Sequence, residues 1–380
     1  MKVLHIITGL RNEGAQAVLY RLIVTDRDHT HHVISLMDMD DYGKKLLALG
    51  IRVHALNMPC GRLRLHGIVK LFRLIREIKP NVVQTWMYHA NLVGGVISVF
   101  AGNKTVVWGI HHSDLSPGKL SKRTLLVARI CAWFSWFIPT TIICCSDIAA
   151  TVHTSLGFDS NRITVIHNGI NLSEFQPDAQ ERARIRNFFG ICEEVVLLGM
   201  VARWDAHKDH ATLVAALAQM KLKLPYSWHC MLIGSGMDKS NRDLVCLLDR
   251  WGIRDHFILA GQSSDVPSLL NALDLHVLSS SGEAFGNVTV EAMATGVPSV
   301  VTSVGAGALI VGETGWVVPP SDPKAMCDAI CDAINKMSDR NAWSARKIAC
   351  RARIIEYFSI DRMVNAYIEV WNIALQKDIH

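Results

Sequence analysis

The sequence lacks the cysteine patterns that mark metal-binding and disulfide-rich proteins. Its ten cysteines are spaced irregularly, without a Cys-x-x-Cys pair and without a Cys/His set at zinc-ligand spacing. The first ten residues, MKVLHIITGL, lack the apolar segment and cleavage site of a signal peptide and are typical of a buried strand. We therefore expect reduced cysteines, no structural metal and a cytoplasmic location.

The sequence also has little charge and no strong compositional bias. Of its 380 residues, 19% are charged and 50% are hydrophobic, which excludes a disordered or fibrous chain and suits two domains. Lys and Arg outnumber Asp and Glu by 19 to 10 in residues 1–166, whereas residues 167–380 hold 20 basic and 24 acidic side chains. The two halves should therefore meet different partners.

Short apolar runs alternate with stretches of helical periodicity, which predicts βαβ crossovers and parallel sheets. Strands are expected at residues 2–8, 31–36, 51–56, 81–86, 104–110, 140–145 and 163–166, and then at 195–201, 228–233, 256–260, 274–278, 298–302 and 316–318. Helices are expected at residues 15–25, 42–49, 64–79, 89–101 and 118–137, and then at 208–223, 238–251, 265–272, 288–295, 322–337 and 341–377.

The restart of this pattern after Gly190 divides the chain into two α/β domains. Residues 167–177 have the turn-forming composition of a hinge. We expect a Rossmann-like domain at 1–166, a second one at 178–355, and a C-terminal helix at 356–380 that packs back toward the first domain. Two doubly wound domains of this kind would face a central cleft and bind ligands at the carboxyl ends of their strands.

Two segments of the first half suggest membrane contact. Residues 124–145 are long and apolar enough for a transmembrane helix, but Arg129 and Pro139 interrupt them, which favours a buried or interfacial helix with the basic segment Lys119–Arg129. Arg62–Lys79 is a basic amphipathic stretch that suits anionic lipid. The alternative is a crossover helix with a solvated basic face. Nucleic acid is disfavoured because no recognition motif accompanies the charge.

Two cations follow the first strand of the second domain. Arg203 stands at the end of strand 195–201, and Lys208 stands where the next helix begins. Cations at a strand exit and a helix start can hold a diphosphate and stabilise its charge while a bond to it breaks. The alternative is a pair of exposed residues in ordinary surface ion pairs.

The loop and helix at residues 279–295 hold a second set of candidates. Glycines in the loop 279–286 let a ligand approach the backbone, and Asn287 is expected to cap the helix. The N-terminus of that helix offers N–H groups and a partial positive charge to a phosphate. Glu283 stands in the loop, and Glu291 stands about one turn into the helix.

Residues 279–302 resemble the Glu-x7-Glu signature of the family 4 glycosyltransferases. That signature contains Glu-Gly-Phe-Gly and then Glu-Ala-Met-Ala-x-Gly-x-Pro. This sequence has Glu-Ala-Phe-Gly at 283–286 and Glu-Ala-Met-Ala-Thr-Gly-Val-Pro at 291–298, with Ala284 in place of the commoner glycine. Arg203 and Lys208 resemble the family's diphosphate-binding pair. The resemblance extends over most of the chain.

The resemblance implies a GT-B fold and a role for each matching residue. Glu291 would hold the ribose hydroxyls of the nucleotide, and Glu283 would face the donor sugar. Gly14, in the loop after the first strand, would lie beneath the diphosphate, while the base would meet backbone near Gly261 and Gln262. Further donor contacts would come from the N-terminal end of the 288–295 helix, namely Phe285, Gly286, Asn287 and Val288.

Histidines after the strand ending at Ile110 are also candidates. The resemblance implies that His111 contacts the donor sugar, with His112 as the alternative; a loop histidine without a role is the third reading. The cluster of His29, His31 and His32 precedes an early strand and is expected at the solvated surface.

The resemblance implies transfer with retention of anomeric configuration. No Asp-x-Asp motif stands at the end of a strand beside the candidate site, so we expect no metal ion and no cofactor besides the nucleotide sugar, with Arg203 and Lys208 stabilising the departing diphosphate. The alternatives are a sugar-nucleotide epimerase or phosphorylase and a non-enzymatic binding module. The basic first half favours a lipid-linked glycan acceptor in bacterial surface polysaccharide synthesis, and UDP is the favoured nucleotide.

Overall fold

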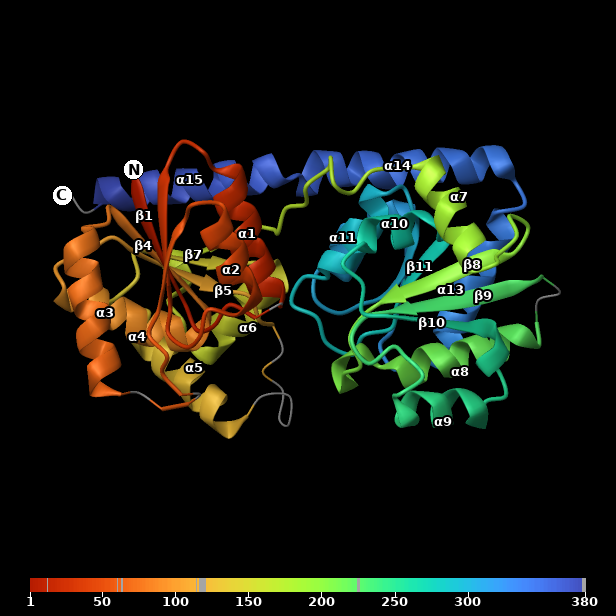
Figure 1. Ribbon diagram of the computed structural model, residues 1–380, viewed down its shortest axis with the longest axis horizontal. Helices are drawn as coiled ribbons and strands as arrows, with labels where there is room; N and C mark the ends of the chain where they lie inside the picture. The colour runs from red at the N-terminus through yellow and green to blue at the C-terminus, as the bar shows by residue number, and fades with distance from the viewer. Residues whose placement is uncertain are drawn as a thin grey trace. The chain divides into compact units, whose positions relative to one another are not determined.

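The computed structural model describes residues 1–11, 13–59, 61–62, 64–113, 115, 121–223 and 226–377 (Figure 1). The chain forms two compact units: unit 1 consists of Met1–Gly169 and Ile360–His380, and unit 2 consists of Ile170–Ser359. A parallel sheet forms the centre of each unit, which confirms the predicted α/β class with two doubly wound sheets.

The sheet of unit 1 has seven parallel strands in the order β3-β2-β1-β4-β5-β6-β7. The strands are β1 (Lys2–Ile7), β2 (Thr30–Ser35), β3 (Arg52–Ala55), β4 (Val82–Trp86), β5 (Val106–Ile110), β6 (Thr141–Cys144) and β7 (Ile163–Val165). The strand order reverses between β1 and β4, and such a switch point is where open α/β sheets bind ligands beyond their strand ends.

Helices cover both faces of this sheet (Figure 1). On one face α3 (Leu65–Ile78), α4 (Met87–Phe100) and α5 (Lys122–Phe134) pack in succession; on the other, α1 (Gly14–Thr25) packs beside α2 (Asp40–Ala48) and the C-terminal α15 (Ile360–Lys377). Strand β1 shows the division, because Val3 and Ile7 join the core with α1 and α15, whereas Leu4 and Ile6 join the core with α3.

The sheet of unit 2 has six parallel strands in the order β10-β9-β8-β11-β12-β13. They are β8 (Val196–Val201), β9 (Trp228–Ile233), β10 (Phe257–Gly261), β11 (Leu275–Leu278), β12 (Ser299–Thr302) and β13 (Trp316–Val318). The helices are α7 (Ala179–Phe188), α8 (His210–Lys221), α9 (Arg242–Arg250), α10 (Val266–Asn271), α11 (Asn287–Ala294), α12 (Gly307–Val311), α13 (Pro323–Lys336) and α14 (Arg340–Phe358). The switch point here lies between β8 and β11.

Three helices are not among those expected from the sequence: α6 (Asp147–Leu156), α7 and α12. The sequence of α7, AQERARIRNF, has too few apolar residues to show a helical period, and α12 has only five residues. The long stretch expected at 341–377 is two helices, because Ser359 between α14 and α15 has an extended backbone.

The prediction that His29, His31 and His32 lie at the solvated surface is wrong. Strand β2 lies between β1 and β3, so His31 and His32 are buried and His29 is half-buried. Consecutive histidines do not show the alternation of apolar and polar residues that is typical of a strand. Their burial depends on the neighbouring strands and helices.

The apolar stretch at 124–145 divides into part of α5, a short connection and β6. Within the part of the chain that the structure describes, no helix combines the length and the hydrophobicity needed to cross a membrane. Lys119, at the start of the predicted basic segment, lies outside the described residues.

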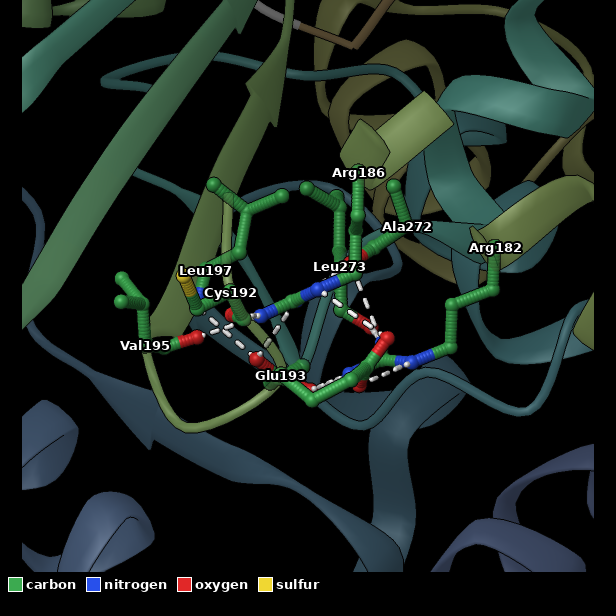
Figure 2. A network of polar contacts seen from close by, with 9 residues as sticks. Arg182, Arg186, Cys192, Glu193, Val195, Leu197, Ala272 and Leu273 are labelled. Carbon is green, nitrogen blue, oxygen red and sulfur yellow. Dashed lines mark hydrogen bonds and ion pairs between the residues drawn. The ribbon is translucent and has the colours of Figure 1, made fainter. Parts of the chain in front are cut away.

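A buried arginine joins three segments of unit 2 (Figure 2). Arg186 of α7 is 1% exposed, and its guanidinium donates to Cys192 O and Val195 O at 2.6 Å each and to Ala272 O at 3.1 Å. Asp274 Oδ2 lies 3.3 Å from Arg186 Nη1 and accepts the backbone N–H of Leu197 at 2.8 Å. Arg186 therefore fixes α7 to the segments that lead into β8 and β11.

Candidate active site

The candidate residues of unit 2 lie in loops that follow β8 and β11, which are neighbours in the sheet. The loop after β8 holds Arg203 and Lys208, and Asp209 then caps α8. The loop after β11 holds Glu283. Because adjacent parallel strands end at the same edge, the two loops emerge side by side.

Lys208 and Glu283 form an ion pair. The distance between Lys208 Nζ and Glu283 Oε1 is 2.5 Å, and the side chains are 20% and 13% exposed. Ser280 Oγ donates to the same carboxylate oxygen at 2.7 Å. A charge-assisted bond between partly buried groups is stronger and more fixed than a surface pair. The fold thus joins a cation and a carboxylate from two separate predicted motifs.

Hydroxyl groups that the sequence analysis missed hold these loops in place. Ser279 Oγ donates to Lys208 O at 3.0 Å or Asp209 O at 2.9 Å, and Thr302 Oγ1 of β12 donates to Ser280 O at 2.6 Å. In the sequence, the serines at 279–281 indicate only turn composition, because Lys208, Asp209 and Thr302 lie far from them along the chain.

Arg203 stands where β8 ends, as predicted. Its Nε lies 3.2 Å from Asp205 Oδ2, and its side chain is more than half exposed. Asp205 Oδ1 also accepts the backbone N–H of His207 at 2.9 Å. The Arg203 guanidinium therefore stays accessible to an anion at this edge of the sheet.

Helix α11 begins differently from the prediction. The helix starts at Asn287, and Gly286, not Asn287, is its N-cap. Gly286 has φ +104°, a left-handed conformation that glycine adopts without strain. Asn287 and Val288 are thus the first two helical residues. Thr289 Oγ1 is buried and has no hydrogen-bond partner among the described residues.

The start of α11 can bind an anion. The first N–H groups of a helix have no partner within the helix, and the helix dipole places a partial positive charge there. Phe285 fixes the entry to the helix, since its buried ring packs against Phe358 of α14 with 5.7 Å between centroids. Glu291 lies further along α11 and is 9% exposed.

Gly305 is a site residue that the sequence analysis missed. It has φ +53°, and a Cβ atom there would lie 2.5 Å from Glu283 O and 3.0 Å from Glu283 Cβ. Only glycine lets the chain after β12 pass this close to Glu283. The Gly-Ala-Gly sequence at 305–307, directly after a predicted strand, is the signal that could have found it.

Two buried histidines near Lys208 are neutral. Burial lowers the pKa of His276 to about 3 and that of His210 to about 4, and in both cases the Lys208 charge lowers it further. Neutral rings add no positive charge to the site, so Lys208 and Arg203 are its cations.

The predicted base-binding residues lie at the end of β10. Gly261 N–H donates to Met237 O at 2.9 Å, and Gly261 O accepts from Gly234 N–H at 2.8 Å, so its backbone is engaged within unit 2. Gln262 lines a hollow of about 240 Å³ together with residues of α7, including Arg184. None of Lys208, Glu283 and Glu291 lines that hollow.

The predicted residues of unit 1 are His111, His112 and Gly14. His111 follows β5, and its ring stacks on Trp86 with 5.2 Å between centroids and 18° between planes. Burial lowers the pKa of His111 to about 4, so the ring is neutral at neutral pH. His112 lies beside Tyr88 at 6.5 Å, and Gly14 is the first residue of α1.

No group of three or more His, Cys, Asp or Glu side chains in the described ranges is arranged to hold a metal ion. Two acids of this site, Glu283 and Asp205, each face a cation.

Comparisons with known proteins show similarity over both units. The family profile described as "Glycosyltransferase Family 4" matches residues 13–174, and "Glycosyl transferases group 1" matches residues 195–336. The chain is 23% identical over 312 residues to the UDP-Gal:alpha-D-GlcNAc-diphosphoundecaprenol alpha-1,3-galactosyltransferase of Escherichia coli, covering 80% of this chain and 79% of that one. It is 30% identical over 215 residues to the lipopolysaccharide core biosynthesis mannosyltransferase LpsB of Rhizobium meliloti, covering 55% and 60%.

Among solved structures, Anabaena Alr3699/HepE in complex with UDP superposes with a TM-score of 0.86 at 22% identity, covering 98% of this chain and 100% of that one. A likeness at this identity establishes the GT-B fold. Together with the two profile matches, which span most of both units, it identifies the chain as a member of the family 4 glycosyltransferases.

Proposed function

We propose that this enzyme transfers a sugar with retention from a nucleotide diphosphate to a glycan acceptor, without a metal ion. The observation that carries the proposal is the Lys208–Glu283 ion pair at the edge of the sheet where α11 begins. Lys208, Arg203 and the N–H groups of α11 supply the positive charge that a departing diphosphate requires. Glu283 keeps Lys208 in position before the donor binds.

Each of the other residues takes one part of the donor. Glu291 holds the ribose hydroxyls, Gly14 lies beneath the diphosphate, and the neutral ring of His111 contacts the sugar. The acceptor hydroxyl oxygen forms a bond to the anomeric carbon on the face from which the diphosphate departs. Its proton passes to the departing phosphate oxygen, so no carboxylate base is needed.

We infer that the nucleotide is UDP. Anabaena Alr3699/HepE has been crystallised with UDP and with UDP-glucose, and the Escherichia coli relative is named for UDP-Gal. The acceptor of that relative is carried on diphosphoundecaprenol, and the Rhizobium relative acts in lipopolysaccharide core synthesis. A lipid-linked glycan used in bacterial surface polysaccharide synthesis is consistent with the names of both relatives. The enzyme would bind such an acceptor at the inner face of the cytoplasmic membrane.

An exposed aromatic surface on unit 1 supports membrane contact. Leu126, Arg129 and Trp133 lie three and four residues apart on α5 and are all exposed, so they share one helix face. Phe137 packs beside Trp133 with 5.8 Å between ring centroids, and the two side chains are 68% and 64% exposed. We call these four residues and Trp136 the aromatic surface. Aromatic rings beside a cation are typical of a protein that inserts into the lipid headgroup region.

The basic stretch at 62–79 adds charge to the same unit. Helix α3 buries Gly67, Leu71, Ile75 and Ile78 and exposes its basic residues, Lys70, Arg73 and Arg76, with Arg62, Arg64 and Lys79 exposed at its ends. Each cation near an anionic bilayer contributes roughly 1 kcal/mol to binding. A face of this charge suits an anionic lipid surface.

Transfer to a lipid-linked acceptor tests the proposal. The acceptor is an undecaprenyl-diphosphate-linked glycan in vesicles with or without phosphatidylglycerol, and the double variant Trp133→Ser/Phe137→Ser is compared with Trp251→Ser, an exposed tryptophan of unit 2. Loss of two inserted rings should lower vesicle binding about tenfold or more. We expect sugar transfer to be faster on vesicles with phosphatidylglycerol than on vesicles without it. This difference should disappear in the double variant and remain in Trp251→Ser. Equal transfer to a water-soluble acceptor, with no dependence on vesicles, would contradict the lipid-linked acceptor.

A further inference from the structure

A chain of polar side chains crosses the interior of unit 1. His5 of β1 is fully buried, and its Nε2 lies 3.0 Å from Nδ1 of His31 on the neighbouring β2. His31 Nε2 lies 3.2 Å from Asp26 Oδ2, just beyond the end of α1. On the other side, Trp86 Nε1 donates to His5 Nδ1 at 3.3 Å. Two hydrogen bonds, Trp86 to His5 and His5 to His31, and one close contact, His31 to Asp26, thus link four side chains from four parts of the fold.

The chemistry of these groups fixes the direction of every proton. An indole N–H can only donate, so His5 Nδ1 must accept and the proton of neutral His5 is on Nε2. That proton points at His31 Nδ1, which must accept in turn, so the proton of His31 is on Nε2 and faces the Asp26 carboxylate. Each N–H in the line therefore points away from Trp86 and toward Asp26.

The far end of the line is a stable anion. Burial raises the pKa of Asp26, but the close His31 ring and the hydrogen-bonded His29 ring outweigh this and lower it to about 2. His29 Nδ1 lies 2.8 Å from Asp26 Oδ1. The Asp26 carboxylate therefore remains an acceptor at neutral pH, and burial keeps His5 neutral by lowering its pKa. Buried polar side chains cost desolvation free energy, and apolar side chains of similar size would fill the same space at a lower cost. Packing alone therefore does not account for this line of polar residues.

Trp86 connects this chain to the site. It is the last residue of β4, and its ring is stacked on His111 at 18° and on Tyr367 of α15 at 17°. Both ring nitrogens of His111 are buried and have no hydrogen-bond partner among the described residues. A functional histidine is commonly oriented by a hydrogen bond to its second nitrogen. His111 has the stacked ring of Trp86 as a contact that can hold its ring instead.

We propose that Asp26, His31 and His5 are positioning residues, which fix the indole of Trp86 and thereby orient the ring of His111. The inference deepens the proposed function, since it rests on the contact of His111 with the donor sugar. Other polar and aromatic side chains also face the chain: Trp371 of α15 lies 6.0 Å from His5 and donates to Gln84 Oε1 at 3.0 Å, and His32 lies in the same strand as His31.

The test replaces His5 in the full-length enzyme and observes His111 directly. His5→Phe removes the acceptor of the Trp86 N–H, and a buried donor without an acceptor should turn away. The ring NMR signal of His111 then reports the change: burial lowers the pKa of this ring to about 4, and the titration midpoint should rise by at least one unit from there as water reaches the ring. His5→Asn, which can place an acceptor oxygen near the position of Nδ1, should restore the midpoint.

His32→Phe is the matched control, because it makes the same exchange at a buried histidine of β2 outside the line. It should leave the midpoint unchanged. In a Trp86→Phe background, His5→Phe should add no further shift, since the connecting N–H is already gone. If His5→Phe does not fold, His31→Phe is compared with His32→Phe in the same way. The inference would be overturned if His5→Phe and His32→Phe shifted the midpoint of His111 equally. It would also be overturned if His5→Phe shifted the midpoint as much in the Trp86→Phe background as in the native enzyme.

Kinetics separate this inference from the proposed function. A misplaced His111 should lower kcat about tenfold or more in His5→Phe with the KM of the donor little changed. The expected pattern is a shifted midpoint together with the lower kcat, both restored in His5→Asn. A shifted midpoint with unchanged kcat would remove His111 from the reaction while leaving its orientation by Trp86 in place.

Discussion

Lys208→Met is expected to lower kcat for sugar transfer by about 100- to 1000-fold, the usual cost of removing one group that stabilises charge in a transition state. The Lys208 ammonium lies 2.5 Å from Oε1 of Glu283, which stands in the loop between β11 and α11. When the glycosidic bond breaks, negative charge grows on the diphosphate, and methionine keeps the length of the side chain without its charge. Transfer kinetics at saturating donor measure the change.

Lys223→Met is the control for Lys208→Met. Lys223 also forms an ion pair in unit 2, with Asp328 Oδ1 at 2.7 Å, but at an exposed position between α8 and α13. Its loss should leave kcat within about twofold, since exposed pairs contribute little. A fall of less than tenfold in Lys208→Met would show that the diphosphate is stabilised elsewhere.

Arg186→Ala is expected to destabilise unit 2 by about 3–5 kcal/mol, the cost of breaking a buried ion pair by removing one partner. The substitution leaves the carbonyls of Cys192, Val195 and Ala272 without this guanidinium (Figure 2). It also removes the guanidinium from the carboxylate of Asp274. Urea unfolding followed by the tryptophans of unit 2 measures the loss. Because the chain has two units, the transition of unit 2 is analysed separately.

Arg184→Ala is the matched variant for Arg186→Ala. Arg184 lies on the same helix and also forms ion pairs, to Glu181 and Asp265, but half of its side chain is exposed. Arg184→Ala should lower the free energy of unfolding of unit 2 by no more than about 1 kcal/mol, because exposed ion pairs contribute little. Equal destabilisation by the two variants would show that helix α7 is held by packing and not by the buried guanidinium.

The sequence predicted the architecture well because its local signals agree with the fold. Alternating apolar runs located the strands, and the loops with Lys208 and Glu283 were identified by their place after strands 195–201 and 274–278. Parallel topology then brings the loops together, since β8 and β11 are adjacent. The ion pair itself could not be read from the sequence, because it depends on the order of strands in the sheet.

The features that were missed depend on contacts between distant segments. Gly286 and not Asn287 is the cap, because the loop enters α11 through a left-handed backbone conformation, which glycine adopts without strain. His5 and His31 are ordinary strand residues in the sequence, and only the pairing of β1 with β2 places a nitrogen of each ring 3.0 Å from the other. The close approach of Gly305 to Glu283 also depends on the fold, because the two residues belong to different loops.

The most direct test of the central claim is nucleotide release from a panel of UDP- and GDP-sugars in EDTA, compared between the native enzyme, Glu283→Ala and Lys208→Met. The account predicts metal-independent release of UDP from one donor in the presence of acceptor, and its loss in both variants. Release that requires added Mg²⁺ or Mn²⁺, or that persists in both variants, would contradict the account, because the diphosphate would then be stabilised by something other than the Lys208–Glu283 site.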